Sequence, residues 1–473
     1  MSAPFRPYDT NQQFLLPPNL REWLAPEHRA YFIMDVVAEL NLSAIYRYYD
    51  FVPVKNEQGE VVGERAKTNR GMPAYEPRMM VTLLFYAYVN GTPGSRVIEK
   101  KCQEDVAFRI LSGNQQPDHT VISEFRRVHL KALRELFVQV LQLCQKVGLL
   151  NLGDVALDGT KVKANASKHK AMSYDRMVTK EAELKAEVEG LLRQAEQVDE
   201  EEDRKYGKGK RGDELPEELA RRESRLKKIQ EAKAALEQEA KEAAEQKRQE
   251  REELEKQAQE EGRNVPGKPP QISEEPDPKA QKNFTDPESR IMKNSDKAFI
   301  QGYNAQAAVT KKAQIIVGCE VTAQAADAPH AVRMADQVRE NTGSYPKRMM
   351  EDAGYFSEEN VRAYEERGIE PFIATGRQKH SEKPAAAAPG PIPKKATIKD
   401  RMKRKLSTAA GRAIYALRKV IVEPVFGQIR TRGLVRFWLR GLEKVNGEWS
   451  LWCTTHNLMK LFRSGRFGAA LTG

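Results

Sequence analysis

The stretch NLGDVALDGTKVKANAS, residues 151–167, decides how the chain is interpreted. Its first half is an apolar, alternating run that predicts a strand, and Asp158 stands near the end of that strand. Gly159 follows, and the polar tail carries Lys161 and Lys163. Because Asp-Gly is a common turn pair, a strand running into a turn explains the stretch by itself. A functional interpretation requires further carboxylates that the fold brings to the same point.

The charge balance favours a polyanionic partner. The chain has 473 residues, enough for two or three domains with their own cores. Lys and Arg total 78 and Asp and Glu total 67, which gives a net charge of +11. Ribosome contact, an acidic membrane surface or simple solubility would also account for this balance, which concerns association and not fold.

Cysteine usage and hydropathy predict an intracellular protein. The four cysteines lie far apart without a Cys-x-x-Cys pair, which argues against a disulfide framework or a zinc site and fits a reducing cytosol. No apolar run reaches the ~18–20 residues needed to span a bilayer. The first residues lack the charged and then apolar pattern of a signal peptide. We therefore expect a cytoplasmic protein without a membrane segment.

Residues 1–150 predict an all-helical domain. Apolar spacing and capping residues predict helices over 25–42 and 76–91, around 96–101 and 104–111, and from Asp118 as N-cap to 148. The last of these is basic and offers Arg126 and Arg127 on its exposed side. Short helices followed by a basic longer helix fit a helix-turn-helix type DNA binder, and a plain helical bundle with a solvated basic face fits equally.

Residues 173–283 interrupt the pattern as a charged insertion. Heptad spacing over 173–262 predicts two helices folded back as an antiparallel coiled-coil hairpin, with one chain's half of an intermolecular coiled coil as the alternative. A charged, Gly-containing link, 199–213, separates the two helices, and a Pro-rich linker, 261–284, leads back to the core.

After the insertion the chain becomes α/β. We expect strands over 298–309 and 314–323 as a hairpin, a helix with Asp327 as N-cap, a strand ending at Asp352, a helix capped by Ser357, a strand over 370–375, a Pro/Ala-rich loop over 383–393 and a basic helical stretch from Asp400. With the strand that carries Asp158, this order predicts a mixed five-stranded sheet flanked by helices. Functional residues in such sheets tend to lie at strand ends.

Three carboxylates could converge in this sheet, namely Asp158, Asp352 and Glu423. Carboxylates held close together repel each other unless hard cations lie between them, and carboxylate and water ligands suit Mg²⁺ or Mn²⁺. Two such ions about 3.5–4 Å apart stabilise the entering and leaving oxygens in phosphodiester cleavage. The structural alternatives are a turn cap for Asp352 and a surface position for Glu423. However, residues 394–440 hold 14 Lys and Arg and only two acids, so an acid kept in that run favours metal binding.

Three sequence blocks together resemble a known family. They are EDAGYFSEENV (351–361), TDPESRIMKN (285–294) with FIQGYNAQAAV (299–309), and YALRKVIVEPVFGQIRTRGLVRFWLRG (415–441). They resemble bacterial insertion-sequence transposases of the DDE type, which have an RNase-H-like core. The resemblance is to the insertion-sequence group eleven-eighty-two, which is related to groups four and five.

The resemblance implies that Asp158, Asp352 and Glu423 are the catalytic and metal-binding triad, with two Mg²⁺ ions per site that Mn²⁺ can replace. Around the glutamate, the related families carry the signature Tyr-x2-Arg-x3-Glu-x6-Lys. Tyr415 and Arg418 match its start, but four residues separate Arg418 from Glu423, and Arg430 stands in place of the lysine.

Helix geometry bears on the DNA-binding residues around Glu423. Positions 415, 419 and 423 share one face of a continuous helix, so Lys419 is as good a candidate as Arg418 to bind a DNA phosphate. Pro424 disfavours helical conformation at Glu423 and predicts a kink or a helix start there.

The resemblance implies a bacterial, nucleoid-associated DNA transposase that acts as a homodimer. It would bind terminal inverted repeats, cleave at the transposon ends and join the 3′-hydroxyl to target DNA. The expected domains are 1–150 for DNA binding or dimerisation, 151–172 as the first core strand, 173–283 as the insertion and 284–473 as the rest of the core. The expected DNA-binding residues are Lys161, Lys163, Tyr415, Arg418, Lys419, Arg430, Arg126 and Arg127. The alternatives are a DNA-binding protein without catalysis and a nuclease that does not join strands. No phosphate-cradling Gly loop is present, so we expect no nucleotide cofactor.

Overall fold

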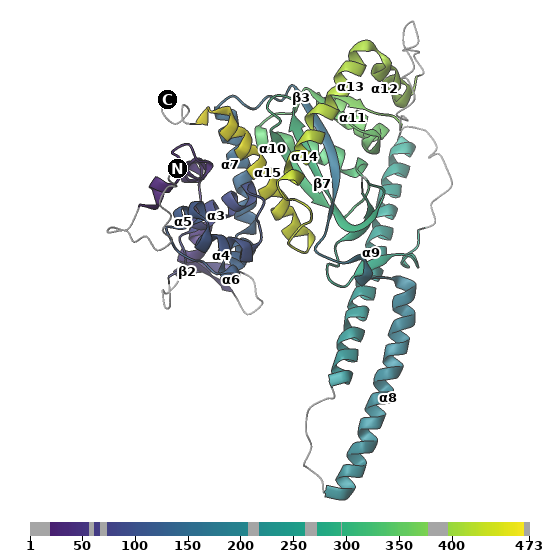
Figure 1. Cartoon of the computed structure of the whole chain (residues 1–473). Coiled ribbons are helices and arrows are strands. Elements are labelled where there is room, and N and C mark those ends of the chain that lie inside the picture. The colour runs from purple at the N-terminus through teal and green to yellow at the C-terminus, as the bar shows by residue number, and fades with distance from the viewer. Residues whose placement is uncertain are drawn as a thin grey trace, which may run out of the picture.

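The computed structural model describes residues 19–55, 61–66, 73–206, 217–260, 272–294, 296–376 and 396–467. A mixed sheet flanked by helices lies at the centre, a helical N-terminal region packs to one side, and a long helical hairpin projects from the core (Figure 1). The second part of the predicted glycine-containing link, 207–213, lies outside the described residues, as do the Pro/Ala-rich loop 383–393 and much of the Pro-rich linker. None of the described helices is long and apolar enough to cross a membrane.

The sheet is built around two long strands, β3 and β7, which confirms the predicted mixed α/β architecture. Within the described residues it has six strands: β3 (Asp154–Lys163), β6 (Arg290–Lys293), β7 (Phe299–Thr310), β8 (Ile316–Thr322), β9 (Arg348–Glu351) and β10 (Glu370–Ile373). β7 runs antiparallel to β3, β6 and β8, whereas β9 is parallel to both β3 and β10. The five-strand prediction missed β6, because only Met292 of that short strand is buried and it shows no apolar run.

Helices cover both faces of the sheet. They are α10 (Ala331–Thr342), α11 (Glu358–Glu366), α12 (Ile398–Ser407), α13 (Ala409–Ile421), α14 (Glu423–Thr431) and α15 (Leu442–Ser464). α10 packs on one face of β8, and α13 lies on the opposite face, against β9 and β3. The free edge of β8 is closed by amide side chains, since Asn446 and Asn457 of α15 each bond both backbone groups of one β8 residue. This arrangement satisfies an edge that would otherwise be open to pairing with another chain.

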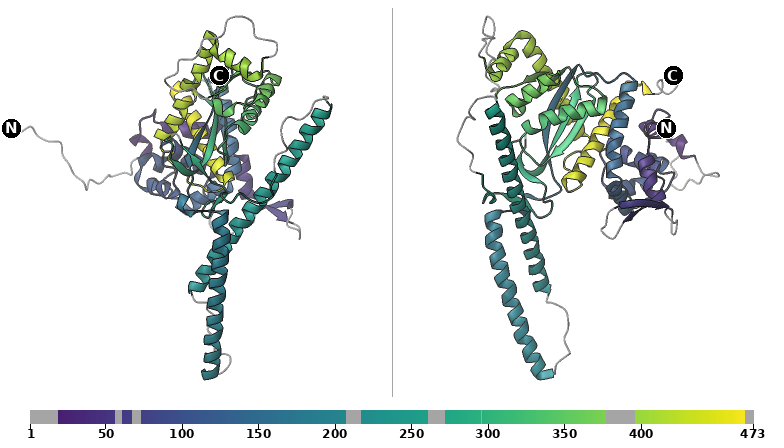
Figure 2. Two further views of the ribbon diagram at one scale, coloured as in Figure 1. Left: turned by 90° about the vertical axis from the view of Figure 1, so that its right-hand side faces the viewer. Right: turned by 180° about the vertical axis from the view of Figure 1, so that it is seen from behind.

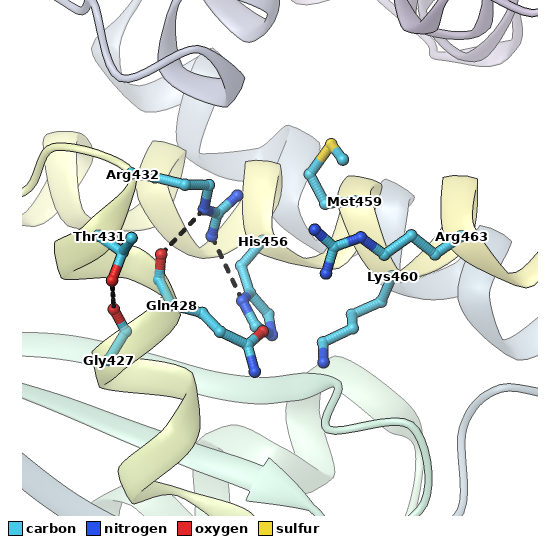
Figure 3. Close-up of a pocket in the computed structure, with 8 residues that line it drawn as sticks. All are labelled: Gly427, Gln428, Thr431, Arg432, His456, Met459, Lys460 and Arg463. Carbon is cyan, nitrogen blue, oxygen red and sulfur yellow. Dashed lines mark hydrogen bonds between the residues drawn. The ribbon is translucent and has the colours of Figure 1, made fainter.

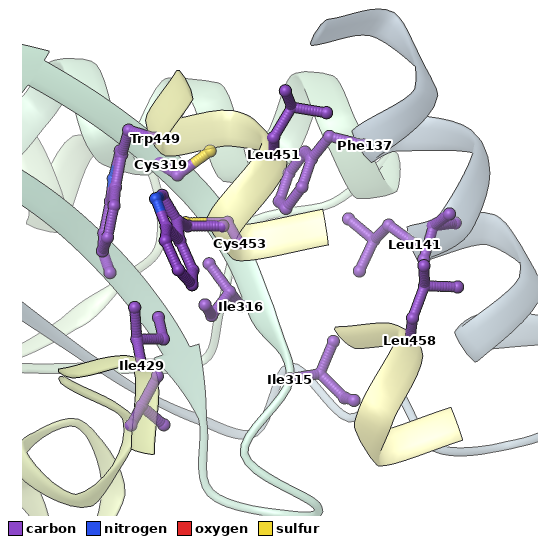
Figure 4. Close-up of a cluster of buried hydrophobic side chains, with 14 of the residues drawn as sticks. Phe137, Leu141, Ile315, Ile316, Cys319, Ile429, Trp449, Leu451, Cys453 and Leu458 are labelled. Atoms are coloured by element: carbon purple, nitrogen blue, oxygen red, sulfur yellow. The ribbon is translucent and has the colours of Figure 1, made fainter. Parts of the chain in front are cut away.

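The helix α15 is buried on nearly all sides and joins the sheet to the N-terminal region. Trp449 and Trp452 are fully buried. Figure 4 shows Leu451 and Leu458 of α15 beside Phe137 and Leu141 of the N-terminal region. Its buried residues include polar side chains such as Glu448 and Asn457 as well as apolar ones, so neighbouring elements cover the helix on nearly every face. Accordingly, the N-terminal helices and the sheet share one hydrophobic core.

The N-terminal region is mostly helical but not entirely so. Its helices are α1 (Arg29–Glu39), α2 (Ser43–Asp50), α3 (Pro77–Val89), α4 (Ser95–Glu104), α5 (Val106–Leu111), α6 (His119–Val128) and α7 (Leu130–Lys146). The all-helical prediction was wrong in one place, because β1 (Phe51–Lys55) and β2 (Val61–Ala66) pair as an antiparallel hairpin. The predicted N-cap Asp118 is confirmed, but the long helix breaks at His129, where the buried ring bonds the Tyr49 hydroxyl.

The insertion forms two long helices, α8 (Tyr174–Tyr206) and α9 (Glu217–Glu260), above a small sheet of β4 (Ala171–Ser173) and β5 (Gln281–Asn283). Cross-helix contacts join Tyr174 to Glu237, Glu181 to Lys233 and Glu187 to Arg222, so the helices run antiparallel. Apolar residues line their seam, namely Met177, Leu184, Ile229 and Leu236. α9 continues past the hairpin, and the left view of Figure 2 shows its C-terminal part slanting away from the core. Residues 199–206, predicted as part of the link, belong to α8.

Candidate active site

Asp158 lies in the middle of β3 and not in a turn. Gly159 continues the strand opposite Gln306 of β7, so the interpretation of Asp-Gly as a turn is wrong. A side chain at position 159 would meet crowded polar groups, since its Cβ would lie 2.4 Å from the Gln306 amide nitrogen and 2.8 Å from Asp327 Oδ1. The glycine is therefore required by close approach of neighbouring side chains and not by a reversal of the chain.

Asp352 directly follows β9, which pairs with β3 only up to Ala156, so the carboxylate of Asp352 comes near Asp158 beyond the end of that pairing. Its Oδ1 accepts the Gly354 N–H at 2.8 Å, which makes Asp352 the N-cap of the short 3₁₀ helix η4 (Ala353–Tyr355). The expected turn-capping role is present, and it fixes the carboxylate in place. Burial and, to a smaller extent, the negative charge of Asp352 raise the pKa of Asp158 to about 7 against the opposing effect of Arg418.

Glu423 is the first residue of α14, and the preceding helix α13 ends at Ile421. This confirms the helix start that Pro424 predicted, because proline is tolerated in the first turn of a helix but not in its interior. The Glu423 side chain is half exposed, in contrast to the nearly buried Asp158.

The side chain of Arg418 lies between Asp158 and Glu423 and contacts both. Its Nη1 lies 2.9 Å from Asp158 Oδ2, and its Nη2 lies 3.5 Å from Glu423 Oε1. The helix-face argument that made Lys419 an equal candidate assumed one straight helix, whereas the break between α13 and α14 turns Glu423 towards the Arg418 guanidinium. Lys419 is exposed on the outer side, and its DNA contact stays a prediction.

The two faces of the sheet divide the predicted residues. Side chains alternate along a strand, so Asp158 and Thr160 share the face that Arg418 and Arg430 cover. Arg430 donates a hydrogen bond to the Thr160 hydroxyl, which places it where the signature expects a cation. Lys161 points to the opposite face, so the structure does not bring it beside Asp158.

Asp327 is a functional candidate that the sequence interpretation missed. The expected N-cap role was wrong, since its side chain makes no capping bond. Instead Oδ1 accepts from Lys161 Nζ at 3.1 Å, Asn304 Nδ2 at 2.7 Å and Gln306 Nε2 at 2.8 Å. A Cβ atom added to Gly354 would lie 3.2 Å from Asp327 Oδ2 and 3.0 Å from Asp352 Oδ1. The two carboxylates therefore lie on either side of the same small space. The available signal was the polar pair at alternate positions 304 and 306 in an otherwise apolar strand.

The remaining predicted DNA-binding residues differ in exposure. Arg126 is 4% exposed and donates to the Pro93 carbonyl at 2.9 Å, so the structure contradicts its assignment to an exposed basic face. Arg127 is exposed and pairs with Glu124. Tyr415 is half-buried beside Arg418, and burial raises the pKa of its hydroxyl. Lys163 is exposed at the end of β3.

The donor set suits a hard divalent cation, although the side chains are not gathered around one. Within the described residues, no three His, Cys, Asp or Glu side chains are close enough together to hold a metal ion. The guanidinium of Arg418 contacts two of the acids in this arrangement. The available donors are all carboxylate oxygens, and the nearly buried Asp158 has a raised pKa that a cation would lower. The residues therefore fit Mg²⁺ or Mn²⁺ better than zinc.

Comparison with known protein families gives two matches. Residues 20–128 match the model described as Transposase domain (DUF772), and residues 276–458 match the Transposase DDE domain. The chain belongs to the DDE transposases of insertion sequences. No curated protein and no solved structure matches it. Membership of the particular insertion-sequence group stays a prediction.

Family membership makes this protein a DNA-cleaving and strand-transferring enzyme, and it implies an RNase-H-like core and divalent metal ions. The DDE match covers Asp352 and Glu423 but begins after Asp158, which precedes the insertion. In the transposase, pairing of β3 with β7 and β9 returns Asp158 to the part of the chain that the family model describes.

Proposed function

We propose that the transposase binds the terminal inverted repeats of its element, cleaves at their ends and joins the freed 3′-hydroxyl to target DNA. Asp158, Asp352 and Glu423 are the residues that would hold two Mg²⁺ ions, with Mn²⁺ as a substitute. When bound, such ions activate the attacking oxygen and stabilise the leaving oxygen of the phosphodiester. The observation that carries the proposal is that the Arg418 guanidinium contacts both Asp158 and Glu423, two acids that lie far apart in the sequence.

The other side chains of the site prepare it for a phosphate. Arg418 and Arg430 supply positive charge on the face of the sheet that carries Asp158, where a phosphodiester would lie. Asp327 acts as a positioning residue: it fixes Lys161 and the two amides of β7 behind the strand, and its charge acts on Asp158. Tyr415 packs beside Arg418 and limits its movement.

We infer the roles of the other regions from their positions. The segment 1–150 would contact the inverted repeats or a second subunit, with Arg127 as one contact, while 151–172 and 284–473 form the catalytic core. The hairpin within 173–283 projects away from the core and offers a surface for a second copy of the chain or for DNA (Figure 2). A homodimer brings two transposon ends together.

The test is a combined cleavage and joining assay. A labelled duplex carrying the element's own end and a target plasmid are incubated with wild type, Asp158→Ala or the control Glu365→Ala, which changes an exposed acid of α11. We expect cleaved and joined products from wild type and the control in Mg²⁺, and binding without either product from Asp158→Ala. Cleavage without joining would establish a nuclease. Binding without cleavage in Mg²⁺ or Mn²⁺ would establish a non-catalytic protein.

A further inference from the structure

A cavity of about 380 Å³ lies between α14 and α15, separate from the acidic site. Figure 3 shows the side chains that line it, and three of them, Arg432, Lys460 and Arg463, are cationic. Gln428 and His456 complete the polar lining. A cavity with several cations and fixed hydrogen-bond donors has the chemistry of an anion site.

The cations of this cavity have only neutral partners within the described part of the chain. Arg432 donates to the carbonyl of Gln428 and Thr455 and contacts His456 Nδ1 at 3.3 Å. Lys460 Nζ donates to Gln314 Oε1 at 2.8 Å. Arg463 has no ion pair with any described carboxylate. Arg432 and Lys460 are partly buried, and a charge removed from water without a counter-ion is costly, so these two cations lack a partner that would neutralise them.

The electrostatics agree with that geometry. Burial, together with the positive charge of the neighbouring Arg463, lowers the pKa of Arg432 to about 10. Burial also lowers the pKa of Lys460, and repulsion from Arg463 and Arg432 contributes to the lowering. His456 is kept neutral, because burial and then Arg432 lower its pKa to about 3. Arg432 and Lys460 are therefore destabilised by neighbouring cations as well as by burial, and an anion bound between them would relieve that repulsion.

The position of the cavity indicates which anion it receives. Its α14 residues begin four positions after Glu423, the first residue of the same helix. At a rise of about 1.5 Å per residue, they lie about 6–12 Å from Glu423 along the helix axis. One strand of duplex DNA carries a phosphate about every 3.4 Å along its axis. This distance corresponds to a few nucleotides from the position of cleavage.

We propose that the cavity formed by Arg432, Lys460 and Arg463 binds a backbone phosphate of the DNA a few nucleotides from the catalytic acids. The inference rests on the proposed DNA substrate, but it does not require that cleavage occurs. Arg432 supplies a planar fork of donors and Lys460 a point charge, which together suit a phosphate group. A free phosphate or a nucleotide phosphate has the same chemistry, so the test must separate these sources from DNA.

The experiment measures DNA affinity against salt without Mg²⁺, by fluorescence anisotropy of a labelled duplex that carries the element's end. The variants are Arg463→Gln, which changes an exposed side chain, and the double variant Lys460→Gln/Arg463→Gln. The control is Lys444→Gln, an exposed lysine at the other end of α15. We expect the slope of log affinity against log salt to fall by about 1 in the single variant, and to be unchanged in the control.

A second readout distinguishes this role from a structural one. Because Arg463→Gln removes a repulsive charge, its melting temperature should equal or exceed that of wild type while its DNA affinity falls. Unchanged salt slopes in both variants would overturn the inference. The inference would also be overturned if the salt slopes of DNA binding were the same in wild type and variants while inorganic phosphate raised the melting temperature of wild type but not of the double variant. That result would assign the cavity to a free anion. A wild type that binds DNA with the expected slopes but cleaves nothing would contradict the proposed function and leave this inference intact.

Discussion

Asp327→Asn tests the acid that the sequence interpretation overlooked. The substitution keeps an oxygen where Lys161, Asn304 and Gln306 donate, but it removes the charge that pairs with Lys161 at 3.1 Å. Hydrogen bonds to charged groups contribute about 1.5–3 kcal/mol each, and this pair is mostly shielded from solvent. Substitution of residues that orient metal ligands without binding the metal themselves typically changes metal affinity or activity by about 10–100-fold. We therefore expect end cleavage to slow by that factor while the protein stays folded.

The assay is single-turnover cleavage of a labelled transposon end across a Mg²⁺ titration. The matched control is Asp336→Asn, because Asp336 also pairs with a cation, Arg367 at 2.8 Å, but on the outer side of α10. We expect Asp327→Asn to lower the cleavage rate or to raise the Mg²⁺ needed for half-saturation, and the control to do neither. The reasoning fails if Asp327→Asn cleaves at the wild-type rate with unchanged Mg²⁺ dependence, or if the control is equally impaired.

Three further predictions concern stability and DNA binding. Arg418→Met removes the cation between Asp158 and Glu423, two of the proposed catalytic acids, so we expect the metal-free protein to lose about 3 kcal/mol and Mg²⁺ to restore much of the loss; denaturation with and without Mg²⁺ would contradict this if the loss were the same in both. Gly447→Ala should cost about 1–3 kcal/mol in chemical denaturation, because its Cβ would lie 2.4 Å from Leu130 Cδ1 where α15 meets α7; a neutral result would refute that packing. Arg126→Ala should lower the melting temperature, whereas Arg127→Ala should leave it unchanged and weaken duplex binding; the reverse pattern would contradict the assigned exposures.

Much of the sheet could be predicted from local signals. The hairpin of β7 and β8 follows from two apolar runs and a short link, and the alternation of helix and strand predicts β9 and β10. The break at Glu423 was predicted because Pro424 restricts the backbone whatever the tertiary context. By contrast, the strand hairpin of β1 and β2 lacks a strong apolar alternation, and β6 is too short to show one.

The contacts within the site depended on tertiary geometry that no spacing rule contains. Helix-face arithmetic made Lys419 as good a candidate as Arg418, but it holds only for an unbroken helix, and with the break after Ile421 it is Arg418 that contacts Asp158 and Glu423. The pattern around Asp327 resembles a helix cap, yet its carboxylate turns to the polar side chains of β7. Arg126 was predicted to be exposed because its helix is rich in basic residues, whereas its guanidinium is buried and donates a hydrogen bond to the Pro93 carbonyl.

The most direct test of the account is where a divalent ion binds. Fe²⁺ can replace Mg²⁺ and, with ascorbate and peroxide, generates hydroxyl radicals that cut the protein backbone close to the bound ion. We expect cuts near Asp158, Asp352 and Glu423, three segments far apart in the chain, with protection by excess Mg²⁺ and loss of all three in Asp158→Ala. Cuts elsewhere, or the same three cuts in Asp158→Ala, would contradict the claim that these acids form one metal-dependent catalytic site.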